Sequence, residues 1–342
     1  MKQILKSEIK LNLVVDMYGC PNRCRHCWLG HMPNRRMEED ADVFIVGYFS
    51  PYFDKIAYYS WLREPDYCDD YKERWERDLK ISRNVRPERF ELASFWRIVR
   101  DPEYIPFLKS LGVRKVQLTF FGTETTQDLY VGRKGAYREV MRASELLMEN
   151  GIIPRWQCFI NQENREEIVR LYEIAKEIRE SSCPELEFFV HEGSCEGENR
   201  KLYPIRIRKQ DIPEELIPVY LDHDRLLSEK ECCEILADDD SHPSFDTGDE
   251  LTLNISNEYD VYYNFTHMTK EWIIGNLKKD EADELVSRIL DKDTAALNKA
   301  RHISWSALVR EYGDKESDRA FSLGDYRMYL FNKYLEDDRR EL

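Results

Sequence analysis

The chain has 342 residues, with 51 Lys and Arg against 66 Asp and Glu, and a formal net charge of −15. A chain of that charge repels phosphate backbones, so DNA and RNA are poor candidates for its substrate or partner. Hydrophobic residues make up 42% of the chain and aromatic residues 12%, which is enough for a packed core and argues against extensive disorder. The length suits one large domain with a smaller appendage.

The N-terminal sequence MKQILKSEIK lacks the apolar core of a signal peptide. No apolar run approaches the roughly 20 residues that a membrane span needs. We therefore expect a cytoplasmic protein without a membrane partner. The chain has nine Cys, and in a reducing compartment clustered Cys indicate metal or redox chemistry more often than disulfides.

Short apolar runs alternate with segments of helical periodicity through the first half of the chain. Strands are predicted at residues 11–17, 55–61, 90–95, 113–121, 153–160 and 186–191. Helices are predicted at residues 37–48, 71–81, 101–111, 137–150 and 163–178, with Gly112 and Gly151 as stops. This alternation predicts an α/β fold with a parallel sheet and crossover helices. Six units are fewer than the eight of a closed barrel, so we expect an open, curved sheet.

The alternation stops near Gly193. Residues 196–250 are polar, with a helix predicted within 214–236, and the runs at 251–255 and 261–265 predict a hairpin. Further helices are predicted at 279–290, 294–312 and 323–336. We therefore expect a main α/β domain over residues 1–195, a connecting segment on the substrate side over 196–250, and a C-terminal α+β extension of hairpin and helices over 251–342.

The sequence CPNRCRHCW places Cys20, Cys24 and Cys27 in a C-x3-C-x2-C array directly after the first predicted strand. Reactive groups of parallel α/β folds gather at the carboxyl ends of strands. Three thiolates hold three irons of a four-iron cluster and leave the fourth iron open for a ligand. The alternative is structural zinc, with His26 or His31 as the fourth ligand.

This array and its position resemble the signature of the radical S-adenosylmethionine (SAM) superfamily, and the similarity extends over about residues 10–192. The resemblance implies a partial (β/α)6 barrel, one [4Fe–4S] cluster on Cys20, Cys24 and Cys27, and SAM at the open iron. In that family an electron from the cluster cleaves SAM to methionine and a 5′-deoxyadenosyl radical, which abstracts a hydrogen atom from the substrate. The electron comes from a donor such as flavodoxin or ferredoxin.

Later segments resemble the family's SAM-binding motifs. In SWLREPD, Glu64 and Pro65 match the second half of a Gly-Gly-Glu-Pro motif, which implies that Glu64 binds the SAM ammonium, whereas Leu62 and Arg63 depart from the glycines. The resemblance implies further SAM contacts by Ser94, Thr119, Arg133, Gln157, Asn161, His26 and Trp28. The alternatives are a cluster-shielding role for the rings of His26 and Trp28, and a salt bridge to a surface acid for Arg133. Cys158 is expected on the opposite, core face of its strand.

Residues 251–277 resemble the hairpin that opens the family's common SPASM or twitch accessory domain. That domain carries extra clusters on further Cys, but this chain has no Cys after Cys233. We therefore expect a degenerate accessory region and a single cluster. Tyr259, Tyr262, Tyr263 and Phe265 of the hairpin either stack on a substrate or form core, which is the commoner role.

These patterns predict a radical SAM enzyme that acts on a small metabolite or a peptide. A chain without an auxiliary cluster favours a reaction that needs no further electron acceptor, such as epimerisation. Cys232 and Cys233 are candidate hydrogen-atom donors for such a reaction, and buried inert thiols are the alternative. The other candidate functions are an oxidative peptide maturase and a non-catalytic, zinc-stapled scaffold.

Overall fold

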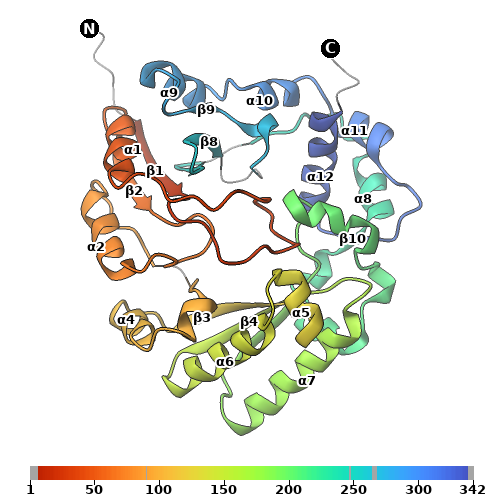
Figure 1. The fold of residues 1–342 in the computed structure, drawn as a ribbon. Coiled ribbons are helices and arrows are strands. Elements are labelled where there is room, and N and C mark those ends of the chain that lie inside the picture. Colours follow the sequence, from red (N-terminus) through yellow and green to blue (C-terminus); the bar gives the residue numbers. More distant parts are fainter. Residues whose placement is uncertain (1–6, 90, 246–247, 264–267, 338–342) are drawn as a thin grey trace. The chain divides into compact units, whose positions relative to one another are not determined.

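The computed structural model describes residues 7–89, 91–245, 248–263 and 268–337. They form two compact units whose segments interleave along the chain (Figure 1). Unit 1 comprises residues 1–21, 32–89 and 244–302, and unit 2 comprises residues 22–31, 90–243 and 303–342. Each unit therefore combines N-terminal and C-terminal segments, whereas the predicted domains follow sequence order. The three-part division at residues 195 and 250 stays a prediction.

Unit 1 is built on a five-stranded sheet of order β2-β1-β7-β8-β9. The strands are β1 (Ser7–Val15), β2 (Phe53–Tyr59), β7 (Glu250–Ile255), β8 (Asp260–Tyr263) and β9 (Gly275–Asn276). β1 is parallel to both of its neighbours, β2 and β7, and the last two strands run antiparallel. Along β1 the side chains of Leu11, Leu13 and Val15 are fully buried, which is the period of two that a half-buried strand requires.

The helices of unit 1 are α1 (Ala41–Phe49), α2 (Tyr71–Ile81), α9 (Ala282–Leu290) and α10 (Ala295–Ala300), with a 3-10 turn at Lys270–Trp272. A buried ion pair joins α1 to α2. Asp42, which is fully buried, accepts a hydrogen bond of 2.8 Å from Arg74 Nη1 and also pairs with Arg77. A buried charge is tolerated only when it is paired and hydrogen-bonded, so this pair fixes the packing of the two helices.

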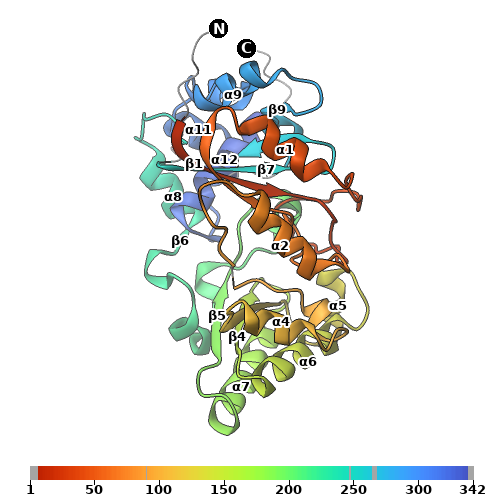
Figure 2. The same ribbon diagram turned by 90° about the vertical axis from the view of Figure 1, so that its left-hand side faces the viewer.

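Unit 2 contains a three-stranded parallel sheet of order β3-β4-β5. Its strands are β3 (Lys115–Phe120), β4 (Ile153–Phe159) and β5 (Glu187–His191). Helices α6 (Ala136–Glu149) and α7 (Arg165–Ser181) lie along this sheet (Figure 2). Trp156 Nε1 donates to Ser144 Oγ of α6 at 2.9 Å, and Phe188 packs on Tyr172 of α7 at 5.1 Å between ring centroids. Both helices therefore cover the same, fully buried face.

The other face of this sheet, which we call the half-exposed face, carries polar side chains. Gln117 and Thr119 of β3, Gln157 of β4 and His191 of β5 all lie on it and are half-buried. Successive residues of a strand point to opposite faces, so these four side chains belong to one surface. A polar surface on a parallel sheet is unusual, because both faces of such sheets are normally apolar.

Unit 2 also contains further helices, 3-10 segments and a short strand pair. They are α3 (Phe95–Ile98), α4 (Tyr104–Ser110), α5 (Glu124–Val131), α8 (Glu229–Leu236), α11 (Trp305–Tyr312), α12 (Leu323–Glu336), the 3-10 segments Gly197–Ile205, Lys209–Asp211, Glu214–Val219 and His223–Arg225, and the antiparallel pair β6 (Leu227–Ser228) and β10 (Ala320–Phe321). α8 begins with a capping box, in which Ser228 and Glu231 satisfy each other's backbone N–H groups.

Most predicted elements are present, and α2 and α12 have the predicted bounds. The predicted strand at 90–95 is wrong in its described part. Only Leu92 forms an isolated bridge, to Gln117, because Ser94 accepts a hydrogen bond from the Arg97 N–H at 3.2 Å and starts α3. Phe90 lies outside the described residues.

Two long helices were also expected and are divided in the structure. The predicted helix within 214–236 is a 3-10 segment interrupted at Pro218, a second 3-10 turn, and α8. The predicted helix at 294–312 is split into α10 and α11, because Ser304 caps a new helix by accepting from the Ala307 N–H.

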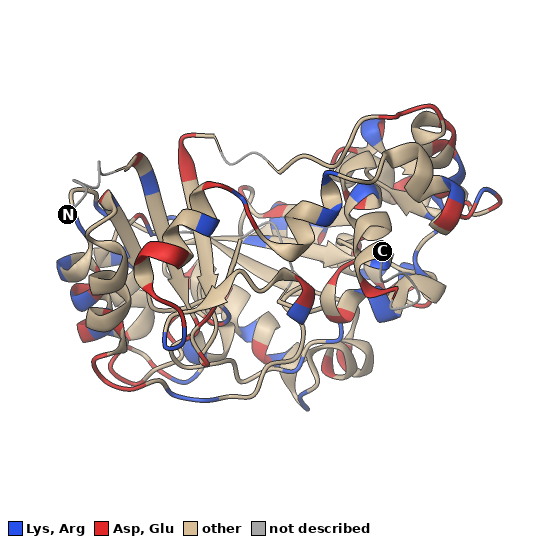
Figure 3. Ribbon diagram, turned by 90° about the horizontal axis from the view of Figure 1, so that it is seen from above, with Lys and Arg blue, Asp and Glu red and all other residues tan. Residues whose placement is uncertain are grey.

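The predicted hairpin is confirmed as β7 and β8, although β7 pairs with β1 on its other side. Tyr259, Tyr262 and Tyr263 are buried, so the described aromatic residues of the hairpin form core. Phe265 lies outside the described residues. Residues of both charges alternate along the ribbon (Figure 3). Within the described ranges, no helix combines the length and the apolar character that crossing a membrane requires.

The Asp42 pair gives a first testable prediction. Replacing Asp42→Ala leaves Arg74 buried without its carboxylate, so the free energy of unfolding should fall by about 3–5 kcal/mol. Urea titration followed by far-ultraviolet circular dichroism measures this change. The matched control is Asp40→Ala, an exposed residue two positions earlier, which should change stability by less than about 0.5 kcal/mol. Equal effects of the two variants would contradict the assignment.

Candidate active site

The three cysteines of the C-x3-C-x2-C array differ from the other six in exposure. Cys20, Cys24 and Cys27 are half-buried, whereas the remaining six are buried, and none of the nine is in a disulfide. The array lies in the connection between β1 and α1, where the Cys27 N–H donates to the Cys24 carbonyl at 3.2 Å in a tight turn. Accessible thiols on an irregular loop are the donor set that an iron–sulfur cluster takes, so these residues fit such a cluster.

The boundary between the compact units crosses this loop. Cys20 belongs to unit 1, and Cys24 and Cys27 belong to unit 2. Across the described parts of the chain, no three side chains of His, Cys, Asp or Glu are grouped so as to hold a metal ion. The fit to a cluster therefore rests on the chemistry and accessibility of the three thiols.

In unit 1 the structure brings Cys20 and Glu64 together. The Cys20 Sγ lies 3.8 Å from Glu64 Oε2. The backbone of Cys20 is held on both sides by one side chain, because Asn34 Oδ1 accepts from its N–H at 3.1 Å and Asn34 Nδ2 donates to its carbonyl at 2.7 Å. A predicted cluster ligand and the predicted ligand of the SAM ammonium are thus neighbours.

A buried ion pair holds the segment that carries Glu64. Arg63 forms two hydrogen bonds with the carboxylate of Asp16, from Nε at 2.9 Å and from Nη2 at 2.7 Å, and both side chains are buried. Arg63 Nη1 also donates to the carbonyl of Met32 at 2.9 Å. Asn257 donates to Asp16 at 3.3 Å and to the Pro33 carbonyl at 2.8 Å. We call this group the Asp16–Arg63 clamp.

Sequence reasoning missed the clamp. Arg63 was considered only as a departure from the glycines of the family motif. The signal was present in the sequence, because the first strand runs directly into Asp16 and an Arg directly precedes Glu64 after the second strand. Adjacent parallel strands end at the same edge of a sheet, so opposite charges just beyond them can pair.

In unit 2 the second half of the cysteine loop is fixed by backbone hydrogen bonds. The Arg23 N–H donates to the Val131 carbonyl at 2.9 Å, and the Glu198 N–H donates to the Cys27 carbonyl at 2.9 Å. Gly197 has a φ of +53°, and a Cβ there would lie 2.3 Å from the Trp28 carbonyl oxygen. Only glycine allows this close approach of two backbones.

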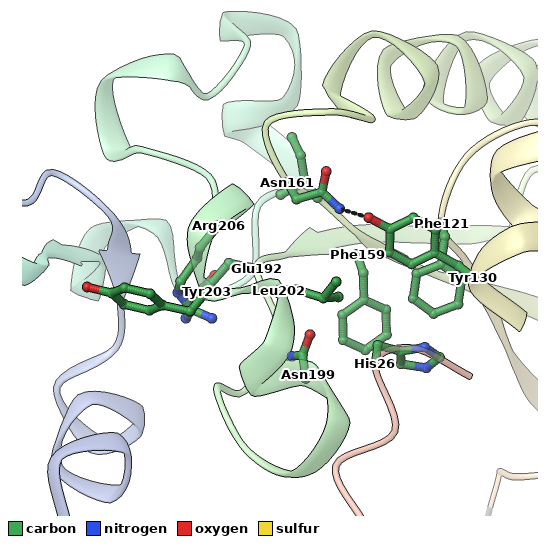
Figure 4. Close-up of a pocket in the computed structure, with 11 residues that line it drawn as sticks. His26, Phe121, Tyr130, Phe159, Asn161, Glu192, Asn199, Leu202, Tyr203 and Arg206 are labelled. Atoms are coloured by element: carbon green, nitrogen blue, oxygen red, sulfur yellow. Dashed lines mark hydrogen bonds and ion pairs between the residues drawn. The ribbon is translucent and has the colours of Figure 1, made fainter. Parts of the chain in front are cut away.

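A small cavity lies beside this half of the loop (Figure 4). Its volume of about 20 Å³ is roughly that of one ordered water. Its lining residues are His26, Phe121, Tyr130, Phe159, Ile160, Asn161, Glu192, Asn199, Leu202, Tyr203 and Arg206. One end is aromatic and the other, around Glu192 and Arg206, is charged (Figure 4).

His26 belongs to the aromatic end of the cavity. Its ring packs on Phe121 at 3.9 Å and on Phe159 at 5.0 Å between centroids. Burial lowers the pKa of His26 to about 3, with a smaller contribution from nearby His191 in the same direction. His26 is therefore neutral, and its Nδ1 has no hydrogen-bond partner among the described residues. Trp28 differs, because 39% of its surface is exposed.

Two of the predicted SAM contacts, Thr119 and Gln157, meet on the half-exposed face of the β3-β4-β5 sheet. The Gln157 amide oxygen accepts from Gln117 Nε2 at 2.7 Å and from Thr119 Oγ1 at 3.5 Å, and the Gln157 amide nitrogen lies 2.7 Å from His191 Nε2. Cys158 lies on the opposite face and is fully buried. The four polar side chains form one connected row across three strands.

The other predicted contacts already have hydrogen-bond partners within unit 2. Ser94 caps α3, and Asn161 accepts from the Glu163 N–H at 2.8 Å and donates to the Tyr130 hydroxyl at 2.8 Å. Arg133 donates to Glu139 Oε2 at 2.5 Å and to Asn22 Oδ1 at 3.1 Å. Arg133 Nη2, however, is buried and without a hydrogen-bond partner in the described chain.

Cys232 and Cys233 lie on α8 and are both buried. The Cys233 Sγ lies 3.1 Å from the Tyr326 hydroxyl. Burial raises the pKa of Cys232 to about 12 and also raises the pKa of Cys233. Both side chains are therefore protonated thiols at neutral pH, and the cavity beside the cysteine loop is lined by other residues.

Comparison with known proteins defines the class of this chain. Residues 14–175 match the model of the radical SAM superfamily, so this segment is a radical SAM domain and the chain that carries it is an enzyme. A radical SAM domain implies a [4Fe–4S] cluster and SAM. No curated protein matches the chain.

Solved structures support the same fold. Native anSMEcpe with bound AdoMet is 14% identical, with a TM-score of 0.53, over 95% of this chain and 96% of that chain. The structure of anSMEcpe with AdoMet and the Cp18Cys peptide gives a TM-score of 0.54 at 14% identity, with the same coverage. SuiB of Streptococcus suis bound to its precursor peptide SuiA gives 0.50 at 13% identity, over 94% of this chain and 76% of that chain. The mixed α/β fold is thus a partial barrel, and the described strands form no closed barrel.

The Asp16–Arg63 clamp gives the second prediction. Replacing Arg63→Ala leaves Asp16 buried without its partner, so the free energy of unfolding should fall by about 3–5 kcal/mol. Because Glu64 and Cys20 depend on the same segment, iron content after anaerobic reconstitution should fall as well. The control Arg35→Ala removes a pair with Glu258 in which both side chains are more than half exposed, and it should leave both quantities unchanged. Normal stability and iron content in Arg63→Ala would contradict the role of the clamp.

Proposed function

We propose that this enzyme reductively cleaves SAM at a single [4Fe–4S] cluster held by Cys20, Cys24 and Cys27, and uses the resulting 5′-deoxyadenosyl radical to abstract hydrogen from a peptide or a small molecule. The observation that carries the proposal is the contrast between these three half-buried thiols and six buried ones, within a radical SAM domain. Once bound, the cluster and SAM supply the electron and the radical.

The chain's own residues would bind and orient SAM. The Glu64 carboxylate is proposed to accept the SAM ammonium in a charge-assisted hydrogen bond, and the Asp16–Arg63 clamp fixes its segment for that task. Thr119 and Gln157 are proposed to bind the ribose from the half-exposed face. Neutral His26 suits a contact with the edge of an adenine ring, because it presents an uncharged aromatic ring. Trp28 is the second proposed adenine contact.

The remaining proposed contacts require a change of partner. Arg133 is suited to bind the SAM carboxylate bidentately, and its buried Nη2 has no hydrogen-bond partner among the described residues. To bind the carboxylate through both nitrogens, Arg133 would have to break its ion pair with Glu139. Ser94 and Asn161 serve the backbone of their own segments. To contact the ribose, both side chains would have to exchange these hydrogen bonds for bonds to SAM.

An electron donor such as flavodoxin or ferredoxin would have to approach the cysteine loop. Arg23 and Arg25 flank Cys24 and are exposed. Positive charge at this place suits an acidic partner despite the net charge of −15 on the chain. A peptide substrate is supported by the neighbours of similar fold that bind peptides, and the acidic chain suits no nucleic acid.

Within this class we propose a redox-neutral reaction, such as epimerisation, since no Cys after Cys233 is present to hold an auxiliary cluster. Such a reaction must return a hydrogen atom to the substrate radical. Cys232 and Cys233 are protonated thiols, which is the form that can donate a hydrogen atom, although both are buried on α8. Oxidative maturation of a peptide, or a zinc-stapled scaffold without catalysis, are the alternatives that the following experiments separate.

The third prediction concerns SAM cleavage. Anaerobically reconstituted, reduced protein should convert SAM to 5′-deoxyadenosine, and Cys24→Ser should lose both this product and the brown iron–sulfur absorbance, because a hydroxyl cannot replace the thiolate. Cys183→Ser, at a buried cysteine outside the loop, should retain both. Chromatography of the product and the visible spectrum measure the two effects. A colourless protein that holds zinc would support the scaffold instead.

The fourth prediction concerns the hydrogen donors. With a substrate that stimulates SAM cleavage, Cys232→Ala or Cys233→Ala should still form 5′-deoxyadenosine but should lose the inverted product, because the substrate radical is no longer quenched. Chiral analysis of the product measures this loss, and Cys183→Ala is the matched control. Unchanged product in both variants would eliminate the two thiols as donors.

A further inference from the structure

One backbone group fixes which side chains donate and which accept hydrogen bonds in the polar row on the half-exposed face. The row consists of Gln117, Thr119, Gln157 and His191, joined by the contacts of 2.7, 3.5 and 2.7 Å given above. Beyond His191, the Gly193 N–H faces the imidazole Nδ1 at 3.2 Å. A backbone N–H can only donate, so it fixes the role of the atom that it meets.

The Gly193 peptide is itself held firmly. Arg206, which is buried, donates from Nη1 to the Gly193 carbonyl at 2.9 Å. Gly193 has a φ of +76°, and a Cβ there would lie 2.8 Å from the ring of Phe159. The N–H of Gly193 is therefore a fixed donor, and His191 Nδ1 is the acceptor.

A neutral imidazole has one acceptor nitrogen and one N–H, so His191 Nε2 must carry the hydrogen. The group of Gln157 at 2.7 Å from Nε2 must then accept, and it is the amide oxygen. The amide reaches this arrangement by a half turn that exchanges its oxygen and nitrogen, and the amide of Gln117, whose Nε2 lies 2.7 Å from the Gln157 oxygen, makes the same half turn. A half turn of the imidazole would instead place a carbon 2.7 Å from the amide, which is inside van der Waals contact.

The neutral state of His191 is consistent with every group that surrounds it. Burial lowers the pKa of His191 to about 4, and the charge of Arg206 acts in the same direction. The rings of Phe159 and Phe189 pack against the imidazole at 4.3 and 5.9 Å between centroids. Gln157 carries no charge. A histidine whose pKa is lowered stays neutral above that pKa, so the row keeps one direction over the physiological range.

The direction propagates along the row. As placed, Gln117 Nε2 and Thr119 Oγ1 both donate to the Gln157 oxygen. With its oxygen on His191 instead, Gln157 turns its NH2 group toward these two residues, so both contacts reverse and each residue must accept through its side-chain oxygen. Each then keeps its own donor, the Thr119 O–H and the Gln117 NH2, for a further partner. We infer that His191 is a positioning residue, which orients Gln157 so that the row offers hydrogen-bond donors to oxygen acceptors of the bound ligand, such as the ribose or carboxylate oxygens of SAM. The ligand part of this inference rests on the proposed function.

The tautomer of His191 is the first test. Nitrogen-15 spectra of histidine-labelled, cluster-loaded, oxidised protein, with the signal assigned by its absence in His191→Gln, should show a neutral ring protonated at Nε2 from about pH 5 to pH 8. A ring protonated at Nδ1, or one that titrates near its ordinary pKa of about 6.5, would overturn the inference. This readout does not depend on activity.

The second test measures the binding of SAM to the same cluster-loaded protein by equilibrium dialysis. Gln157→Glu keeps an acceptor for His191 but removes the donors toward Thr119 and Gln117, so the Kd for SAM should rise about tenfold or more. The control Arg155→Gln, two residues earlier on the same strand face, should leave the Kd within about twofold. An unchanged Kd in Gln157→Glu would overturn the ligand part of the inference. Failure of the wild-type protein to bind SAM would instead overturn the proposed function, and the tautomer would still decide the role of His191.

Discussion

The bidentate ion pair between Asp16 and Arg63 is the interaction on which the unit 1 half of the site depends. It joins the end of β1, from which the cysteine loop departs, to the segment after β2 that carries Glu64. Both charges are buried, so each needs the other, and the extra bonds from Arg63 to Met32 and from Asn257 to Pro33 satisfy groups of the returning loop. Glycines at the position of Arg63 would leave this segment to backbone preference alone.

Unit 2 fixes its part of the site by a different means. Backbone hydrogen bonds from Arg23 and Glu198 hold the second half of the loop, and the Gly193 peptide sets the direction of the polar row. In both units, groups proposed to touch SAM are held by buried, hydrogen-bonded partners, Asp16 in unit 1 and the Gly193 peptide in unit 2. Preorganised polar groups are what SAM chemistry needs, because the radical has to be formed next to the substrate and away from water.

Much of the fold could be predicted from local pattern. The strands β1, β2, β4 and β5 and the helices α2 and α12 follow from apolar periodicity, and the cysteine loop follows from spacing. The parts that could not be predicted depend on distant partners. Nothing local shows that β7 pairs with β1, that Ser94 caps a helix instead of ending a strand, or that Arg63 finds Asp16 47 residues away. Thr119 and Gln157 could be selected as polar residues near strand ends, and His191 ends the predicted strand at 186–191 with the same signal. Its proposed role in orienting Gln157, however, depends on the Gly193 N–H, which no local pattern shows.

Three thiolates are proposed to hold a cluster with an open iron, where SAM binds beside Glu64. The most direct measurement is the electron paramagnetic resonance spectrum of the reduced protein, recorded with and without SAM. The account predicts a [4Fe–4S] signal that changes on addition of SAM in the wild-type protein and changes much less at the same SAM concentration in Glu64→Gln. A wild-type signal that SAM leaves unchanged, or reduced protein without such a signal, would contradict it.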